Sequence, residues 1–299
     1  MKQRLARWTA ALWWRACGQA ERNRCRMYNG AVGLRIICFH NTDPEVFPQF
    51  QRTVEWCRRH FPFASPAEAD ALFAGEYRPG SSDQLLVTLD DGYESNFAAA
   101  KWLTSIGIRA VFFIVPSFVG RSVRQYAEYH RQRGIEPVVL ARGPDLDAVR
   151  GLDLSEIRQM ATMGHRIAAH NFAHRDLGQL HSPKDLDYEI GNAIDMVGEL
   201  TGAPCLDFAY ASGQPENVSD EATAYLLKNC PRVYACHRGL NVPGLTPRFL
   251  LRHHCMDTHP TIFTHECIKG GADGHLAGRM QEMVRRVGVL PASRTEVTS

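Results

Sequence analysis

The sequence of 299 residues contains no apolar run long enough to cross a membrane. Its longest uninterrupted apolar run, residues 110–115, has six residues, whereas a membrane-spanning helix needs about 20. Internal repeats and low-complexity tracts are also missing. Hydrophobic residues make up 44% of the chain and charged residues 22%, so a wholly disordered or collagen-like chain is excluded.

The nine cysteines form no CxxC pair, and their number is odd. A chain of this length needs no disulfide framework, so we expect reduced thiols in a cytoplasmic protein. The N-terminus is basic like that of a signal peptide. Its apolar stretch, residues 10–14, is nevertheless short and is closed by Arg15. We therefore expect no cleaved export signal.

Neither sign of charge is in much excess, with 34 basic and 32 acidic residues and a net charge of +2. The balance is uneven, because residues 1–35 carry eight basic residues against Glu21 alone. The remainder is mildly acidic, which argues against nucleic acid as a partner. We interpret residues 1–32 as a basic helical segment. It either makes peripheral contact with a membrane through Trp and Leu side chains or packs on the body of the protein.

Seven short apolar runs without polar alternation predict strands that are buried on both faces. They lie at residues 34–39, 85–89, 110–115, 166–169, 205–210, 233–236 and 249–251. Helical patterns separate them at residues 50–60, 94–106, 154–163, 183–201 and 219–229.

Alternation of strands and helices indicates parallel strands. The predicted fold is therefore α/β, a distorted (β/α)7-type barrel that forms a single domain at residues 33–290. A doubly wound open sheet is the alternative. We expect an elaborated loop at residues 117–150 and a flexible tail at residues 291–299.

Polar side chains follow several of these strands. In βα barrels the catalytic groups lie at the carboxyl ends of the strands, so such residues are expected to meet. The residues in question are His40, Asp90, Asp91, His170, His237, His253 and His254. Carboxylates and imidazoles repeated at one end of a sheet favour a metal site.

Two of these segments also place potential metal ligands at a characteristic spacing. Residues 88–93 read TLDDGY, and two adjacent carboxylates leaving a buried strand are costly unless a cation or a proton separates their charges. Residues 170–174 read HNFAH, which places two imidazoles one helical turn apart, where both can reach one ion. Two histidines and one carboxylate are the ligand set of an open catalytic metal site.

Three stretches resemble the motif regions of the polysaccharide deacetylases, carbohydrate esterase family 4. TLDDG stands where family members usually have TFDDG, HNFAH where they have H-S/T-x-x-H, and FAYASG (residues 208–213) where they often have FAYPYG. The order and spacing match over residues 33–260. Residues 36–40 (IICFH) resemble the N-terminal segment of the branch whose motifs are circularly permuted.

The resemblance implies a role for each matching position. Asp91, His170 and His174 would bind a divalent ion, expected to be Zn²⁺. Asp90 would be the general base that takes a proton from water. The backbone N–H of Ser212 would bind the oxyanion.

For the general acid the resemblance offers two answers. His40 would protonate the leaving amine if the chain belongs to the permuted branch. His253 and His254 resemble the C-terminal segment of the unpermuted branch and are the rival acids. Tyr93, Tyr210 and this histidine pair are also predicted to contact the substrate.

The chain departs from the family pattern at three places. Leu89 replaces the usual Phe, Asn171 replaces Ser or Thr, and Ala211–Ser212 replace Pro and an aromatic residue. The predicted function is a metal-dependent hydrolase that removes N-acetyl groups from an N-acetylated sugar or polysaccharide. Because the substrate-facing aromatic is lost, two alternatives stay open: amide or ester hydrolysis on a smaller molecule, and a glycan-binding barrel without catalysis.

Overall fold

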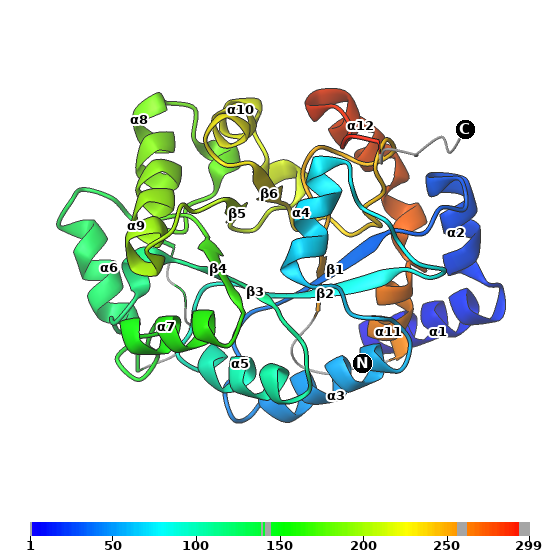
Figure 1. Cartoon of the computed structure of the whole chain (residues 1–299), viewed down its shortest axis with the longest axis horizontal. Helices are drawn as coiled ribbons and strands as arrows, with labels where there is room; N and C mark the ends of the chain where they lie inside the picture. Colours follow the sequence, from blue (N-terminus) through cyan, green and yellow to red (C-terminus); the bar gives the residue numbers. More distant parts are fainter. Residues whose placement is uncertain (1, 139, 141–144, 256–261, 293–299) are drawn as a thin grey trace. The chain divides into compact units, whose positions relative to one another are not determined.

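The computed structural model describes residues 2–138, 140, 145–255 and 262–292. One seven-stranded sheet has the strand order β6-β5-β4-β3-β2-β1-β7, of which Figure 1 labels β1 to β6. The strands are β1 (Leu34–Phe39), β2 (Gln84–Leu89), β3 (Val111–Ile114), β4 (Arg166–Ala169), β5 (Asp207–Ala209), β6 (Arg232–Tyr234) and β7 (His253–His254). The α/β class is confirmed, and so is the distorted (β/α)7-type barrel. It is distorted because β6 and β7 are the two ends of the strand order and do not pair with each other. Within the described ranges, no helix is both long and apolar enough to span a membrane.

The chain divides into two compact units. The first comprises Met1–Ile37, Pro48–Leu86 and His237–Ser299, and the second comprises Cys38–Phe47 and Val87–Cys236. The second unit therefore carries the carboxyl ends of β1 and β2 together with β3 to β6.

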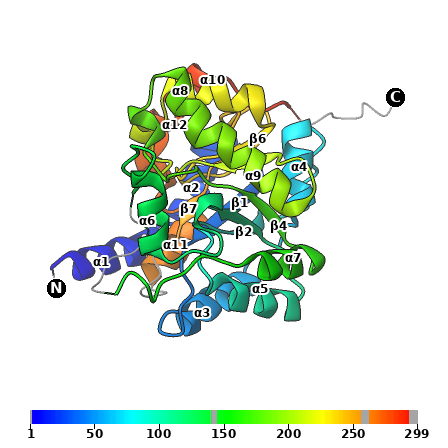
Figure 2. The same cartoon turned by 90° about the vertical axis from the view of Figure 1, so that its left-hand side faces the viewer.

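In the second unit the strands from β2 to β6 pair in parallel. Strand β3 pairs with β4 from Val111–Arg166 to Ile114–Ala169. Every residue of β3 is fully buried, as expected for a strand covered on both faces. The helices are α5 (Asn96–Ser105), α6 (Val123–Arg131), α7 (Leu154–Thr162), α8 (Pro183–Leu186), α9 (Asn192–Thr201) and α10 (Asp220–Asn229). Figure 2 shows α5 and α7 side by side.

Helix α7 shows how the local sequence sets these boundaries. The Asp153 side chain accepts a hydrogen bond from the Glu156 N–H (2.8 Å), and the Glu156 carboxylate accepts one from the Asp153 N–H (2.9 Å). This reciprocal cap satisfies two backbone donors that a helix start leaves unpaired. Gly164, with φ of 86°, then allows the chain to turn into β4.

The first unit contains α1 (Lys2–Ala16), α2 (Gln19–Tyr28), α3 (Phe47–Arg58, whose first residue belongs to the second unit), α4 (Pro66–Ala74), α11 (Ile262–Lys269) and α12 (Ala277–Val287). A buried ion network ties its segments together. Arg35 donates to Asp83 Oδ2 (2.9 Å) and to Asp273 Oδ2 (3.2 Å), and each of the three residues is at most 4% exposed. Such a network is stable only while every charge keeps its partner.

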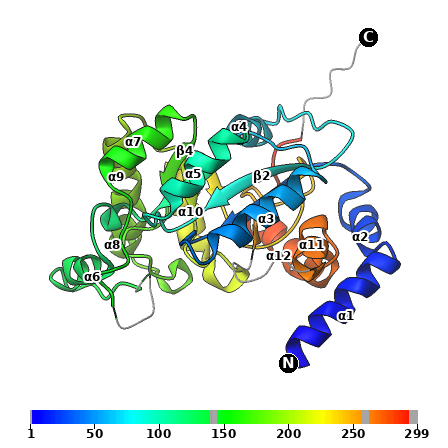
Figure 3. The same cartoon turned by 90° about the horizontal axis from the view of Figure 1, so that it is seen from below.

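Helix α1 has two apolar faces. On one of them, Trp14 contacts Phe263 of α11 with ring centroids 5.6 Å apart, and Arg15 pairs with Glu266 at 3.0 Å. Figure 3 shows α1 running beside α11. The other face carries Leu5, Trp8, Leu12 and Trp13, which are 65%, 54%, 40% and 67% exposed. We call these four side chains the outer face of α1.

Several expected elements differ in the structure. Residues 249–251 are not a strand, and the last strand is instead β7 at His253–His254, so this histidine pair lies on a strand rather than after one. The expected helix at residues 183–201 is interrupted by a π-helical turn, Asp187–Gly191. The expected loop at residues 117–150 contains α6. Residues 293–299 of the predicted tail lie outside the described residues.

Candidate metal centre

Two groups of three potential metal ligands occur in the described part of the chain, both in the second unit. Asp91, His170 and His174 form one, and Cys38, His40 and Asp90 form the other. In each group the ligand atoms lie within 4.8 Å of one another. The structure thus brings together the three residues that the sequence motifs predicted as metal ligands.

The first group follows from strand positions. Asp91 is the second residue after the carboxyl end of β2, and His170 directly follows β4. Asp91 Oδ1 lies 3.4 Å from His170 Nε2 and 3.2 Å from His174 Nε2. In a tetrahedral zinc site, oxygen and nitrogen ligands at ordinary bond lengths lie about 3.3–3.5 Å apart. Both distances from Asp91 Oδ1 therefore agree with the ligand spacing of such a site.

The donor atoms also fit an ion chemically. Asp91 Oδ1 is buried without a hydrogen-bond partner, although two imidazole nitrogens are close to it. The Nδ1 of His170 donates to the backbone oxygen of Ala209 (2.9 Å), which leaves the lone pair on Nε2 facing Asp91. A cation between these atoms would satisfy all three, so the residues present fit a divalent metal.

Electrostatics keep the carboxyl group of Asp91 in its ligating form. Burial by itself raises its pKa, but the imidazoles of His170 and His174, with a smaller contribution from His40, hold the pKa well below its ordinary value. Asp91 is therefore ionised throughout the neutral range.

Backbone strain concentrates at the same loops. Of the five non-glycine residues with positive φ in the described part, four are Asp91 (74°), Asn171 (45°), His174 (54°) and Ser212 (66°). Such conformations cost about 1–3 kcal/mol each and persist where surrounding contacts impose them. Gly92 is required here as well, because a Cβ at this position would lie 2.9 Å from Ile114. The strain marks the loops after β2, β4 and β5 as specially shaped.

The second group surrounds the predicted base. The Cys38 thiol donates to Asp90 Oδ2 at 3.2 Å, and the same oxygen lies 4.0 Å from His170 Nε2. His40 is half-buried, and its backbone oxygen accepts a hydrogen bond from Asn96 Nδ2 (2.8 Å). Sequence reasoning overlooked Cys38. The period of two along a strand was the available signal, because it places Cys38 on the same side as His40.

Two further residues hold the histidine loop, and only Asn171 was singled out in the sequence, as a departure from the family pattern. Asn171 bridges two loops, since its Nδ2 donates to the Arg175 oxygen (2.7 Å) and its Oδ1 accepts from the Ala211 N–H (3.3 Å). Glu189, fully buried in the π-helical turn, accepts from the N–H groups of Phe172 (3.2 Å) and Ala173 (3.0 Å). Its other oxygen accepts from Arg175 Nε at 2.7 Å.

Glu189 carried no sequence signal, because an acidic residue in a long helical pattern normally faces solvent. Burial raises the pKa of Glu189, and the Arg175 guanidinium acts in the opposite direction. The outcome is a buried carboxyl group whose hydrogen bonds fix the loop between the two metal-facing histidines.

The predicted substrate contacts are placed as follows. The Tyr93 hydroxyl donates to the Leu140 oxygen, and the Tyr210 hydroxyl shares a 2.9 Å hydrogen bond with Thr223 Oγ1. Both rings are buried. Ser212, the predicted oxyanion residue, is exposed. The substrate role of the two tyrosines stays a prediction.

The histidine pair of β7 belongs to the first unit. His253 is 8% exposed and His254 is exposed. Burial first, and then the charges of Arg238 and His254, lower the pKa of His253 well below its ordinary value. A neutral imidazole is thus favoured at this position.

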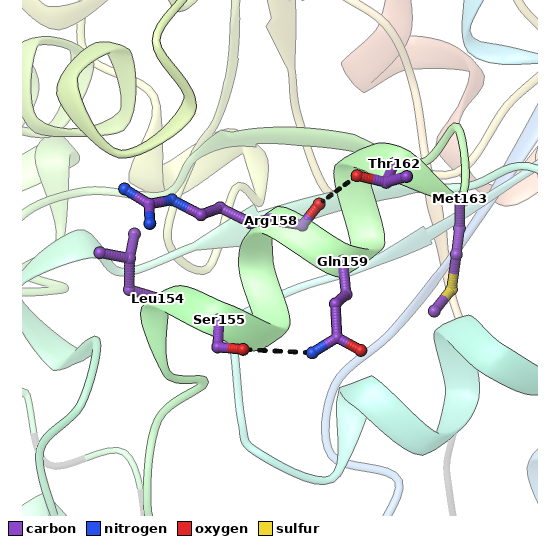
Figure 4. A pocket seen from close by; sticks show the side chains of 6 residues that line it. All are labelled: Leu154, Ser155, Arg158, Gln159, Thr162 and Met163. Atoms are coloured by element: carbon purple, nitrogen blue, oxygen red, sulfur yellow. Dashed lines mark hydrogen bonds between the residues drawn. The ribbon is translucent and has the colours of Figure 1, made fainter.

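A hollow on the surface of α7 is a poor candidate for chemistry (Figure 4). Five of its six lining side chains come from this helix and the sixth from the residue that follows it, and they include no carboxylate, imidazole or thiol. They are Leu154, Ser155, Arg158, Gln159, Thr162 and Met163.

Comparison with known proteins decides the family. The family described as "Polysaccharide deacetylase" matches residues 78–232, more than half of the chain. The chain belongs to the polysaccharide deacetylase family. The resemblance seen in the motifs is confirmed, and the family comprises hydrolases that act on amide bonds. The matched range includes both candidate aspartates, the HNFAH pair and Ser212, whereas His40 and the histidine pair of β7 lie outside it.

Solved structures of low sequence identity share the fold. IcaB from Ammonifex degensii is 20% identical with a TM-score of 0.61, over 81% of this chain and 98% of IcaB. The deacetylase PplD from Streptococcus pyogenes is 18% identical with a TM-score of 0.56, over 76% and 94%. The de-N-acetylase from Aggregatibacter actinomycetemcomitans is 14% identical with a TM-score of 0.58, over 78% and 99%. The search of curated proteins found no match.

Proposed function

We propose that this polysaccharide deacetylase family member is a metal-dependent de-N-acetylase of an N-acetylated sugar or polysaccharide. The observation that carries the proposal is the approach of Asp91 Oδ1 to the Nε2 atoms of His170 and His174, at 3.4 and 3.2 Å. These three residues would hold the ion. When bound, a divalent cation such as Zn²⁺ supplies Lewis-acid polarisation of the acetyl carbonyl and lowers the pKa of water.

The chain's own groups would move the protons. Asp90 lies beside the metal ligands, with its Oδ2 4.0 Å from His170 Nε2, and would take the proton of the attacking water. The thiol of Cys38 orients that carboxylate through its 3.2 Å hydrogen bond. The N–H of Ser212 would donate to the oxyanion. Ser212 lies in the loop after β5, where its left-handed backbone turns the chain away from the strand.

The leaving nitrogen needs a proton to depart as an amine. His40 would supply it, since its ring nitrogen lies within 4.8 Å of Asp90 and its main chain is held by Asn96. The reaction then balances: water adds to the acetyl carbon, the C–N bond breaks, and acetate and a free amine leave. The β7 histidines remain the alternative acids of this proposal.

A second substrate class has its own supporting observation. The exposed Ser212 stands where an aromatic side chain would otherwise contact a sugar ring. Without that stacking surface, hydrolysis of an amide or ester on a smaller molecule is the second candidate function. A barrel that binds glycan without catalysis is the remaining alternative.

Acetate release tests these proposals together. The full chain, supplied with one equivalent of Zn²⁺, is expected to release acetate from N-acetylated sugar oligomers, and Asp91→Asn to release none. Faster release from small amides or esters would support the second candidate. A zinc-loaded chain that releases acetate from no member of the panel would contradict both hydrolytic functions.

We also propose that the outer face of α1 binds an anionic membrane surface. It exposes two tryptophans and two leucines, and the surrounding segment is strongly basic. Tryptophan rings suit the membrane interface because they are apolar with one polar N–H group, and basic residues are attracted to acidic headgroups. The inner face, which packs on α11, holds the helix in place for this contact.

A further inference from the structure

A second set of ligand atoms lies beside the proposed metal centre. Cys38, His40 and Asp90 offer a thiol sulfur, an imidazole nitrogen and a carboxylate oxygen, all within 4.8 Å of one another. Cys38 is the next-to-last residue of β1, and His40 is the first residue after this strand. The metal centre and this set are adjacent, because Asp90 precedes Asp91 in the chain.

The ligand types in this set select a particular class of ion. Sulfur together with nitrogen and oxygen is a donor set for Zn²⁺ or Co²⁺, whereas Mg²⁺ and Ca²⁺ prefer oxygen ligands alone. Cys38 Sγ and Asp90 Oδ2 are 3.2 Å apart, close to the roughly 3.5 Å that separates sulfur and oxygen on tetrahedral zinc. Cys38 and Asp90 are buried at 0% and 2% exposure, and His40 is half-buried.

We propose that Cys38, His40 and Asp90 form a second site for a thiophilic divalent cation such as Zn²⁺, and that an ion bound there stops hydrolysis. On binding, a metal–sulfur bond forms, and the thiol proton that Asp90 now accepts leaves to solvent. The site is weaker than the first, since a dication held by Asp91 and its histidines repels a second one. Zinc thus acts as cofactor when scarce and as inhibitor when abundant.

Inhibition, unlike binding, rests on the proposed function. Asp90 and His40 are the base and acid of that proposal, and a nitrogen or oxygen lone pair that binds a metal cannot exchange a proton. An occupied second site therefore removes both proton-transfer groups at once.

Cobalt titration of the metal-free full chain tests the binding. The reductant should be a phosphine, which keeps the thiols reduced without adding sulfur ligands. The first equivalent should produce only visible ligand-field bands, because the Asp91 group contains no sulfur. The second should add near-ultraviolet sulfur-to-cobalt charge-transfer absorption. Cys38→Ser should lose this absorption and bind one equivalent fewer. Cys25→Ser, which removes an exposed thiol 3.7 Å from Glu21, should behave like the unmodified chain.

Zinc inhibition supplies the second measurement. For each variant, the ratio of acetate release with excess Zn²⁺ to that with one equivalent is compared. At free zinc ten times the second dissociation constant, this ratio should fall about ten-fold in the unmodified chain and change little in Cys38→Ser. A titration that ends at one equivalent, or charge transfer that disappears in Cys25→Ser, would overturn the second site. Sulfur-bound cobalt in a chain that releases no acetate at any metal load would uphold the site and refute the proposed function.

Discussion

Substitution of Glu189 tests whether its carboxylate positions the loop between His170 and His174. Glu189→Gln keeps the shape of the side chain but removes its charge. It also replaces one accepting oxygen by an N–H₂ group, which cannot accept a hydrogen bond from the neighbouring donors. Hydrogen bonds to a charged group contribute about 1.5–3 kcal/mol each, and Glu189 accepts three, at 3.2, 3.0 and 2.7 Å. Breaking a buried ion pair costs about 3–5 kcal/mol.

The net loss should be smaller than the sum of these contributions. Glutamine retains one oxygen as an acceptor, and Arg175 keeps its second partner, Asp185, at 3.2 Å. We therefore expect the free energy of unfolding to fall by about 2–4 kcal/mol. Because the loop also positions His174, zinc affinity should fall by about 10–100-fold, the usual effect of altering a group that orients a metal ligand.

Two assays separate these effects. Urea unfolding in the presence of a chelator gives the loss of stability without metal, and competition with a zinc-binding dye gives the affinity. Glu199→Gln, a substitution of an exposed glutamate on α9, is the matched control and should change neither. Unchanged zinc affinity in Glu189→Gln, even with lowered stability, would refute the idea that this residue positions the loop.

Three further predictions follow from particular side chains. His40→Ala should lower kcat by about 10²–10⁴-fold and leave unchanged the zinc that is retained after loading with one equivalent, whereas replacing His253 and His254 should cost much less; the reverse pattern would assign the acid to β7. Burial, and then the charges of Arg133 and Arg121, lower the pKa of His130 to about 4, so its neutral form is favoured in the folded state. Its contribution to the free energy of unfolding is therefore fully present above the unfolded pKa of about 6.5 and is lost as pH falls toward 4. Between these two pH values, the urea midpoint of His130→Asn should fall less than that of the unmodified chain. An equal fall in both proteins would contradict the lowered pKa of His130. Replacing both tryptophans of the outer face of α1 by serine should abolish sedimentation with anionic vesicles at low salt, while Val289→Ser, an exposed control, should not; equal sedimentation of all three proteins would refute membrane contact.

Much of the fold could be predicted because its signals are local. The β3 segment is apolar at every position, as a strand covered on both faces must be, and α7 begins and ends at recognisable caps. Strand β7 could not be predicted in the same way, since two residues, one exposed, leave no apolar pattern. The preceding apolar residues 249–251 are buried without belonging to a strand.

The candidate site was predictable only where a motif was present. The DDG and HNFAH spacings pointed to residues that do lie together, Asp91 with His170 and His174. Cys38 and Glu189 were missed because their roles depend on contacts across 52 and 14–17 residues of sequence. The period of two places Cys38 on the same side as His40, but its contact with Asp90, like the contacts of Glu189, leaves no local pattern.

Zinc retention is the most direct test of the central claim, that Asp91, His170 and His174 form one metal site. Every protein in the test carries Cys38→Ser, which removes the proposed second site, and each metal-free full chain is loaded with one equivalent of Zn²⁺, dialysed and measured for metal. The Cys38→Ser chain without a further change, and the same chain with Asp195→Asn, an exposed control on α9, should both retain the ion. Asp91→Asn and His170→Ala should each lose it while remaining folded. Retention of the ion by either of these two variants would contradict the account.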